Sequence, residues 1–305
     1  MNILQIKTIS QFHELLKLEP SSHPLITLLE DKDLENMYQL ADHLFDTRFT
    51  TDFYTIMFKD KMSGSLGYGR NSYDYQEGTM IFAGPGQVLT SPKKEDLESK
   101  SGWTLLFHPD LILGTPLSKN IDRYSFFSYE VFEALHLSKK EQEYVFSIVK
   151  KIKEEYSQNL DQHSQSLMVS NLELLLSYCV RFYDRQFFTR TNLNQNVVSK
   201  FEQELKGYFK SEKISKKGLP NSQYFGEVLH FSPNYLSDLL KKETGKSIKD
   251  HVDSYVVKEA KKILLNSNQT VSEVAYLLGY EYPQSFSRLF KKKVGVNPQE
   301  FRNLN

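Results

Sequence analysis

Two short stretches near the end of the chain hold the side chains best suited to reading nucleic acid. Residues 236–245 and 286–295 align without a gap at an offset of 50, and both contain serine, leucine, two lysines and a final glycine at equivalent positions. Their apolar residues fall at i, i+3 and i+4, which predicts an amphipathic helix that ends at the glycine. The polar residues on the opposite face of each helix are then displayed to solvent.

The outward positions in the N-terminal half of each predicted helix have hydrogen-bonding side chains. Arg288 can bind guanine through two hydrogen bonds, and Gln284 can pair with adenine. Asp238 occupies the position that Arg288 has in the second copy. Its carboxylate can only accept hydrogen bonds, from cytosine amino groups among the bases, and phosphate repels it. We predict base contacts from these residues and their outward neighbours: Asn234, Ser237, Asp238, Gln284, Ser285, Ser287 and Arg288.

Lysines gather at the far ends of the same helices, where they can reach phosphate oxygens. Helix C-termini favour lysine in any case, because the macrodipole is negative there. The alternative interpretation is therefore an ordinary helical repeat with a solvated polar face. The predicted phosphate contacts are Lys241, Lys242, Lys291, Lys292 and Lys293.

A shorter helix and a tight turn precede each outward-facing helix. Gly226 lies four residues before the turn residue His230, and Ala275 lies four before Gly279. A small side chain at that position lets two helices pack closely at a steep angle, which is the local pattern of a helix-turn-helix motif.

One helix is predicted between the two copies, over residues 247–266. Ser247 is suited to cap its start, with Asp250 three residues later, and apolar residues recur at helical spacing. Twenty residues give a helix of roughly 30 Å, and major grooves on one face of B-DNA recur about every 34 Å. The length thus predicts two recognition helices held in adjacent major grooves.

These motifs, with residues 260–265, 271–280 and 298–302, resemble the double helix-turn-helix domain of the AraC/XylS family of bacterial transcription regulators. The resemblance covers residues 200–305, and several motifs match in order and spacing. It implies a bipartite DNA site and, usually, a separate effector or dimerisation domain. Many members have arginine at the position of Asp238. The second motif, which has Arg288 at that position, is therefore expected to contribute more to base recognition in this chain.

Length and charge both divide the chain, since 305 residues favour two domains over one. Residues 200–305 hold 18 Lys and Arg against 12 Asp and Glu, whereas residues 1–199 hold 20 against 26. A basic last third is expected if only that third meets phosphate. The first residues lack the pattern of a signal peptide, and no apolar run approaches eighteen residues, so we expect a soluble cytoplasmic protein.

Residues 1–136 are predicted to form a β-rich domain. Aromatic and β-branched runs, broken by Gly and Pro between residues 53 and 107, predict a small β-barrel or sandwich. Residues 78–87 also resemble part of the cupin-like sensor domain common in front of AraC-type domains. That resemblance implies a small-molecule effector, whose contacts remain unknown. The alternatives are control by a partner protein, or constitutive DNA binding with a filled barrel.

Residues 137–190 are predicted to form a helical hairpin, which begins at a capping box of Ser138 and Glu141. Its second helix has more apolar residues than one contact face requires, so we predict a homodimer, with a purely internal core as the alternative. Cys179 within it is interpreted as a core thiol. Residues 191–199 are interpreted as a polar linker. The fold class is thus multidomain α+β, with an all-α domain at 200–305.

Enzymatic activity is not expected. A cupin metal site needs clustered His and carboxylate ligands, yet residues 49–113 contain a single histidine, His108, which we interpret as part of a turn. Nucleophile-elbow, phosphate-loop and dinucleotide motifs are absent from the sequence. We therefore predict no catalytic residue, metal or cofactor, with a fused cupin-type enzyme as a remote alternative. RNA polymerase is a candidate partner besides DNA.

Overall fold

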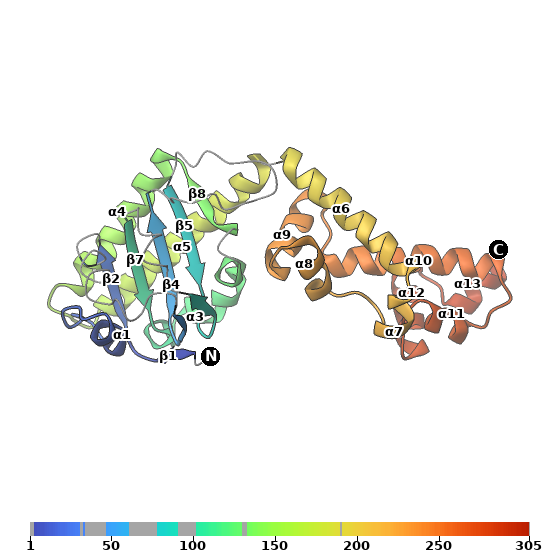
Figure 1. The fold of residues 1–305 in the computed structure, drawn as a ribbon, viewed down its shortest axis with the longest axis horizontal. Helices are drawn as coiled ribbons and strands as arrows, with labels where there is room; N and C mark the ends of the chain where they lie inside the picture. Colours follow the sequence, from blue (N-terminus) through green and yellow to red (C-terminus); the bar gives the residue numbers. More distant parts are fainter. Residues whose placement is uncertain are drawn as a thin grey trace. The chain divides into compact units, whose positions relative to one another are not determined.

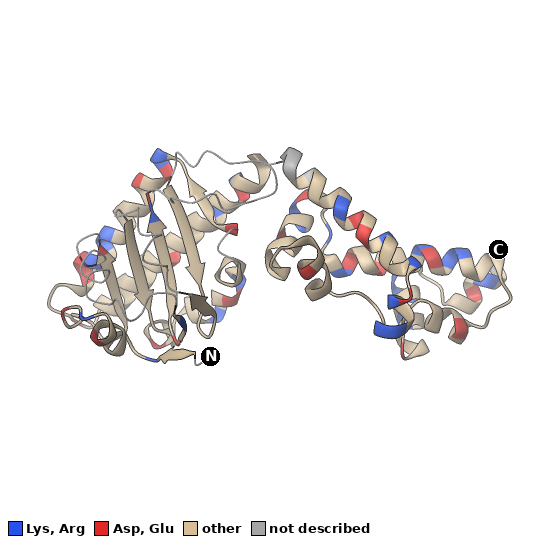
Figure 2. Ribbon diagram, in the orientation of Figure 1, with Lys and Arg blue, Asp and Glu red and all other residues tan. Residues whose placement is uncertain are grey.

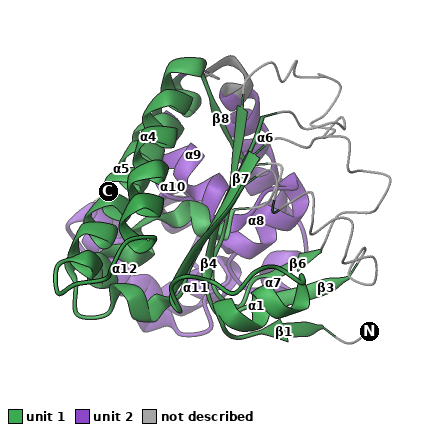
Figure 3. Ribbon diagram, turned by 90° about the vertical axis from the view of Figure 1, so that its left-hand side faces the viewer, with its two compact units in different colours: residues 1–188 green, residues 189–305 purple. Residues whose placement is uncertain are grey.

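The computed structural model describes residues 3–30, 33, 47–60, 78–90, 102–129, 133–189 and 191–304. The chain forms two compact units, residues 1–188 and 189–305 (Figures 1 and 3). The first combines sheets with helices and the second is helical, in agreement with the predicted fold class at this level.

Within the described residues, the strands of the first unit form two sheets. Neighbouring strands of the larger sheet are antiparallel, and three of them lie between residues 53 and 107, the stretch that was predicted to be β-rich. Its order is β2 (Ile26–Glu30), β7 (Gly102–Phe107), β4 (Tyr54–Lys59), β5 (Gly78–Ala83) and β8 (Leu135–Leu137). The smaller sheet has the order β1 (Leu4–Ile6), β3 (Arg48–Thr51) and β6 (Val88–Thr90).

The closed cupin-like barrel expected from the sequence is not confirmed. The described strands form two open sheets, and β2 and β8 are the outer strands of the larger one rather than partners of each other. Residues 61–77 and 91–101 connect strands but lie outside the described residues, as does the stretch 64–69 that was expected to belong to the β region.

The two faces of the larger sheet have different neighbours, because side chains alternate along each strand. Phe58 and Trp103 are buried on one face, with ring centroids 5.9 Å apart, and Phe146 meets Phe58 edge-on at 4.8 Å. Figure 3 shows α4 and α5 on this side, and α1 with the smaller sheet on the other. These helices are α1 (Ile9–Leu15), α4 (Lys139–Tyr156) and α5 (Ser164–Thr189).

The predicted helical hairpin is confirmed as α4 and α5. Ser138 and Glu141 form the expected capping box, in which the Ser138 backbone N–H donates to the Glu141 carboxylate at 2.9 Å. Arg185 of α5 donates to Glu141 Oε2 at 2.8 Å and to the His136 carbonyl at 2.6 Å. The end of α5 is thereby fixed to β8 and to the start of α4.

Short helical turns connect β7 to the hairpin. His108 accepts a hydrogen bond from the Asp110 backbone N–H at 3.2 Å, which confirms its structural role at the start of η3. Cys179 is fully buried in α5, and burial raises the pKa of its thiol far above the usual value. The connecting elements are η3 (Pro109–Ile112), α3 (Pro116–Asn120), η4 (Ile121–Arg123) and η5 (Ser125–Ser128).

The expected irregular linker at 191–199 is wrong, because these residues are the first half of helix α6. Their Asn and Thr content favours turns, but Asn194 is buried and donates to Glu243 Oε1 at 2.7 Å, so its polar group is satisfied inside the second unit. No helix among the described ranges is long and apolar enough to cross a membrane.

The second unit is built from helices throughout its described length. These are α6 (Thr191–Lys210), α7 (Lys213–Lys217), α8 (Ser222–Leu229), α9 (Pro233–Thr244), α10 (Ile248–Asn266), α11 (Val271–Leu277), α12 (Pro283–Val294) and α13 (Pro298–Leu304). Figure 1 shows them in order from yellow to red.

Candidate nucleic-acid interface

The sequence repeat corresponds to two matching helices, α9 and α12. Each has 12 residues and begins with proline. Each ends at a glycine in the left-handed conformation, with φ of 73° at Gly245 and 94° at Gly295. At the start of α9, the Ser232 hydroxyl accepts from the Tyr235 backbone N–H at 3.2 Å. The terminal glycines therefore marked the correct end of both helices.

The turn before each helix also has the expected geometry. His230 and Gly279 both have positive φ, 59° and 84°. A Cβ added to Gly226 would lie 2.7 Å from the Phe231 carbonyl oxygen, so a larger residue cannot fit between α8 and the turn. Ala275, fully buried in α11, is the corresponding small residue in the second motif.

Helix α10 joins the two motifs through a shared core. It begins at the predicted cap, where Ser247 Oγ accepts from the Asp250 backbone N–H at 3.2 Å, and it contains 19 residues. Its buried side chains pack with those of both motifs in one cluster. That cluster includes Phe225, Leu236, Leu240, Val252, Val256, Ala260, Val274, Phe286 and Phe290.

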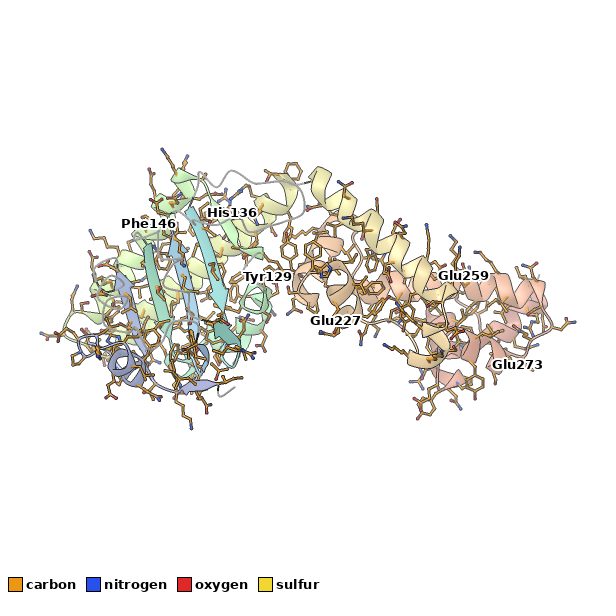
Figure 4. All side chains as sticks on the ribbon, in the orientation of Figure 1. Tyr129, His136, Phe146, Glu227, Glu259 and Glu273 are labelled. Atoms are coloured by element: carbon orange, nitrogen blue, oxygen red, sulfur yellow. The ribbon has the colours of Figure 1, made fainter. Side chains whose placement is uncertain are left out.

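The last helix holds the far end of α10 in place. Arg302 of α13 donates to the Leu264 carbonyl at 3.1 Å and to the Gln269 carbonyl at 2.5 Å. Helices α11 and α13 both begin at a capping side chain, since Thr270 accepts from the backbone N–H of Glu273 and Asn297 accepts from that of Glu300. Glu273 is labelled in Figure 4.

The predicted base-reading residues all lie on the outer sides of α9 and α12, and differ in exposure. Asn234, Gln284, Ser285 and Arg288 are exposed, whereas Ser237, Asp238 and Ser287 are half-buried. Their apolar counterparts face inward: Leu236, Leu239, Leu240, Phe286 and Phe290 are buried, and Leu289 is partly buried.

The five predicted phosphate-contacting lysines are exposed at the ends of these helices. Lys293 Nζ also lies 3.5 Å from Asp250 Oδ1 of α10. The Ser247 hydroxyl, with Lys293 nearby, holds the pKa of Asp250 below its ordinary value. Asp238 and Lys242 likewise interact with other groups of the protein. Figure 2 shows basic and acidic residues interspersed along the helices of this unit, so charge alone does not mark one face.

One candidate contact was missed from the sequence. Tyr282 occupies the N-cap position of α12, makes no side-chain capping hydrogen bond, and is 61% exposed. Pro283 is the sequence signal that could have identified it. Proline favours the first position of a helix, which puts Tyr282 at the N-cap of α12, beside the outward-facing residues of that helix.

Comparison with known proteins identifies this unit. Residues 226–304 match a family model described as a helix-turn-helix domain. The uncharacterised HTH-type transcriptional regulator YobQ of Bacillus subtilis is 38% identical over 77 residues, which cover 25% of this chain and 32% of YobQ. The C-terminal unit is an AraC-type helix-turn-helix domain.

Other proteins share the AraC-type domain over similar lengths. The HTH-type transcriptional activator RhaR of Pectobacterium atrosepticum is 33% identical over 78 residues, 26% of this chain and 28% of RhaR. The C-terminal domain of AraT, a response regulator from Geobacillus stearothermophilus, is 28% identical, with 36% of this chain and 85% of that domain covered and a TM-score of 0.32. The chain spans about a third of the length of the curated relatives named here.

Proposed function

We propose that this protein is a bacterial transcription regulator that binds duplex DNA at a bipartite site. The observation that supports it is the pair of equally long, equally terminated helices α9 and α12 on one core. The 19 residues of α10 give a spacer of about 28 Å, which suits two adjacent major grooves. Regulators named YobQ and RhaR contain the same type of domain.

In this proposal the outward polar residues of α9 and α12 contact bases. Arg288 and Gln284 are exposed near the start of α12, the part of a recognition helix that enters the groove. Asn234, Ser237 and Asp238 occupy the corresponding part of α9, with Ser285 and Ser287 completing α12. The lysines at 241, 242, 291, 292 and 293 contact phosphate, and Lys293 is positioned by Asp250.

DNA binding by the second unit alone tests the proposal. We expect a fragment of residues 189–305 to bind the promoter region upstream of its own gene, more weakly than the full chain. Its log affinity should fall linearly with log salt concentration, because phosphate contacts release counterions. A gel-shift series at several salt concentrations measures this, with a scrambled duplex of equal length as control. Equal affinity for both duplexes, or affinity independent of salt, would contradict sequence-specific binding.

The first unit is proposed to be the regulatory part, a cupin-like domain that responds to a small molecule. Control by a partner protein and constitutive binding are the alternatives. Enzymatic activity is not part of the proposal, although one relative is named as a bifunctional transcriptional activator and DNA repair enzyme, AdaA of Bacillus subtilis. Contact with RNA polymerase is a further proposal for transcription activation.

We also propose that the hairpin α4–α5 forms a homodimer. Leu167 and Leu174, seven residues apart on one side of α5, are 48% and 46% exposed. Tyr144 of α4 is 44% exposed and stacks on Tyr178 of α5 with ring centroids 5.6 Å apart. Exposed apolar groups arranged along one surface favour contact with a second protein surface.

Leu174→Glu is expected to weaken this dimer at least about tenfold, because a charge would enter an apolar contact. Leu113→Glu is the matched control, since Leu113 is 59% exposed but lies outside the hairpin. Sedimentation at micromolar concentrations compares the two variants with the wild type. A wild-type monomer at every concentration, or equal effects of both substitutions, would refute the hairpin interface.

A further inference from the structure

The short helix α7 contacts both helix-turn-helix motifs of the second unit. Its neighbouring residues Lys213 and Ile214 meet different motifs. Lys213 Nζ donates to the Tyr224 hydroxyl of α8 at 3.0 Å and lies 5.0 Å from the centre of that ring. Ile214 is buried and packs at Gly279, the turn residue between α11 and α12. Figure 1 shows α7 beside α11, which it contacts.

The contact between α7 and the second motif is close because a glycine stands on each side of it. A Cβ added to Gly279 would lie 2.6 Å from Ile214 Cδ1 and 3.2 Å from the carbonyl carbon of Gly218. A Cβ added to Gly218 would lie 3.3 Å from the Gly279 carbonyl oxygen. Carbon atoms in optimal contact are about 3.5–4.0 Å apart. The end of α7 and the turn of the second motif therefore approach each other backbone to backbone.

The glycine that meets the second motif is also tied to the first. The Tyr208 hydroxyl of α6 donates to the Gly218 carbonyl at 3.0 Å, and the Tyr208 ring meets that of Tyr224 edge-on at 4.7 Å. Tyr208 is buried, and the Tyr224 hydroxyl also donates to Glu204 of α6. A continuous series of contacts therefore runs from α8 of the first motif, through α6 and α7, to the turn of the second motif.

This series of contacts is separate from the connection through α10. Helices of both motifs pack against α10, and the core cluster that joins them is built around that helix. Ile214 is buried outside that cluster. Two bodies joined along one axis resist rotation about that axis more strongly when a second contact lies away from it. Helix α7 supplies such a contact, so it restrains the angle between the motifs as well as their separation.

We propose that α7 is a brace that fixes the angle between the recognition helices α9 and α12, with Ile214 as the positioning residue. This inference rests on the proposed function, since the brace affects DNA recognition only if both helices enter the duplex. One inserted base pair moves two half-sites apart by about 3.4 Å and turns them by about 35° around the duplex axis. A rigid pair of helices cannot follow that change without losing base contacts. The brace thus makes the spacing between half-sites a determinant of specificity.

The brace is tested first without DNA, in the full-length chain. Spin labels are attached at Asn234→Cys and Gln284→Cys, exposed and equivalent positions near the starts of α9 and α12. Cys179, the single native cysteine, is fully buried and is not expected to react. We expect a narrow distribution of label distances in the otherwise wild-type chain and a broader or shifted one with Ile214→Ala. Ile248→Ala, which truncates a buried isoleucine outside α7, is the matched control and should keep the narrow distribution.

Binding to duplexes of altered spacing is the second measurement. A bipartite site is selected from a randomised duplex library and compared with versions that have one base pair inserted or deleted between its halves. The wild type should prefer the selected spacing at least about fivefold, the lower end of what one bidentate base contact contributes. Ile214→Ala should reduce this preference at least about twofold, as a residue that couples two sites does. Ile248→Ala should leave the preference unchanged.

A gentler variant keeps the test decisive if Ile214→Ala folds poorly. Tyr208→Phe removes only the hydroxyl that is bonded to the Gly218 carbonyl, and it should change both measurements in the same direction as Ile214→Ala. Tyr255→Phe is its matched control, because it removes one hydroxyl from a ring of α10 that also packs against Phe209. The control should change neither measurement.

Three results would overturn the inference. The first is an unchanged distance distribution in both Ile214→Ala and Tyr208→Phe, and the second is a spacing preference that both variants retain or that the wild type lacks. The third is an equal change in the controls, which would indicate a general loss of packing. Failure to select any duplex, or equal affinity for selected and scrambled duplexes, would instead count against the proposed function. The distance measurement would still decide whether α7 is a brace.

Discussion

Lys258→Pro, in the middle of α10, is expected to reduce binding to the bipartite site by at least about 100-fold, whereas Lys258→Ala should leave it nearly unchanged. Lys258 is exposed, so alanine removes only a solvated side chain. Proline removes a backbone donor and its ring collides with the carbonyl four residues earlier, which costs about 3 kcal/mol in a helix interior. Each 1.4 kcal/mol corresponds to a factor of ten in an equilibrium constant. A penalty of about 3 kcal/mol on the helical spacer that DNA binding requires therefore corresponds to the expected loss of affinity of about 100-fold.

Competition binding on the complete site and on each half-site measures this effect. The broken spacer should bring the affinity for the complete site down towards that for one half-site, because the two readers no longer share a fixed separation. Circular dichroism separates a local break from loss of the whole unit. If Lys258→Pro kept its helical signal and bound the complete site as tightly as Lys258→Ala, α10 would not be the spacer.

Arg288→Ala is expected to lower affinity for the cognate site about 10–100-fold and to relax preference at one or two base pairs, as the loss of a bidentate base contact does. The matched control is Lys216→Ala, which also removes one exposed positive charge but from α7, outside both recognition helices. The control should weaken all duplexes equally and slightly. Binding to a panel of single base-pair variants distinguishes loss of a base contact from loss of charge.

Asp238→Asn tests the equivalent position of α9 in the same binding experiment. Asp238 is half-buried and interacts with other groups of the protein, so removing its charge is expected to strengthen binding to non-cognate duplexes modestly. If Asp238 reads a cytosine, Asp238→Asn weakens the cognate site while other duplexes bind as before or more tightly. Unchanged preference in both Arg288→Ala and Asp238→Asn would show that neither helix lies in a groove as proposed.

The second unit could be predicted closely because its signals are local. The cap at Ser247 marked the start of α10, and the terminal glycines marked the ends of α9 and α12. The same local reasoning failed at 191–199, where the partner of Asn194 is Glu243, 49 residues away. The ion pair of Lys293 with Asp250 was missed for the same reason.

The first unit was predicted less completely because sheets depend on distant pairings. Individual strands followed from composition, but the order β2-β7-β4-β5-β8 pairs segments that lie far apart in the sequence. Burial within the repeat was not predictable from the sequence either. Leu239 and Leu289 are equivalent residues, yet Leu239 is buried and Leu289 only partly buried, because their neighbours differ.

The shared core of the two motifs has a thermodynamic consequence. Because side chains of α8, α9, α11 and α12 meet those of α10 in one cluster, neither motif has a separate interior that could persist if the other unfolded. A duplex that binds only the native unit shifts the folding equilibrium by mass action, in proportion to the logarithm of its free concentration over Kd. If the two motifs bind DNA as proposed, occupation of one half-site is therefore expected to stabilise the other motif against unfolding, before that motif has touched DNA.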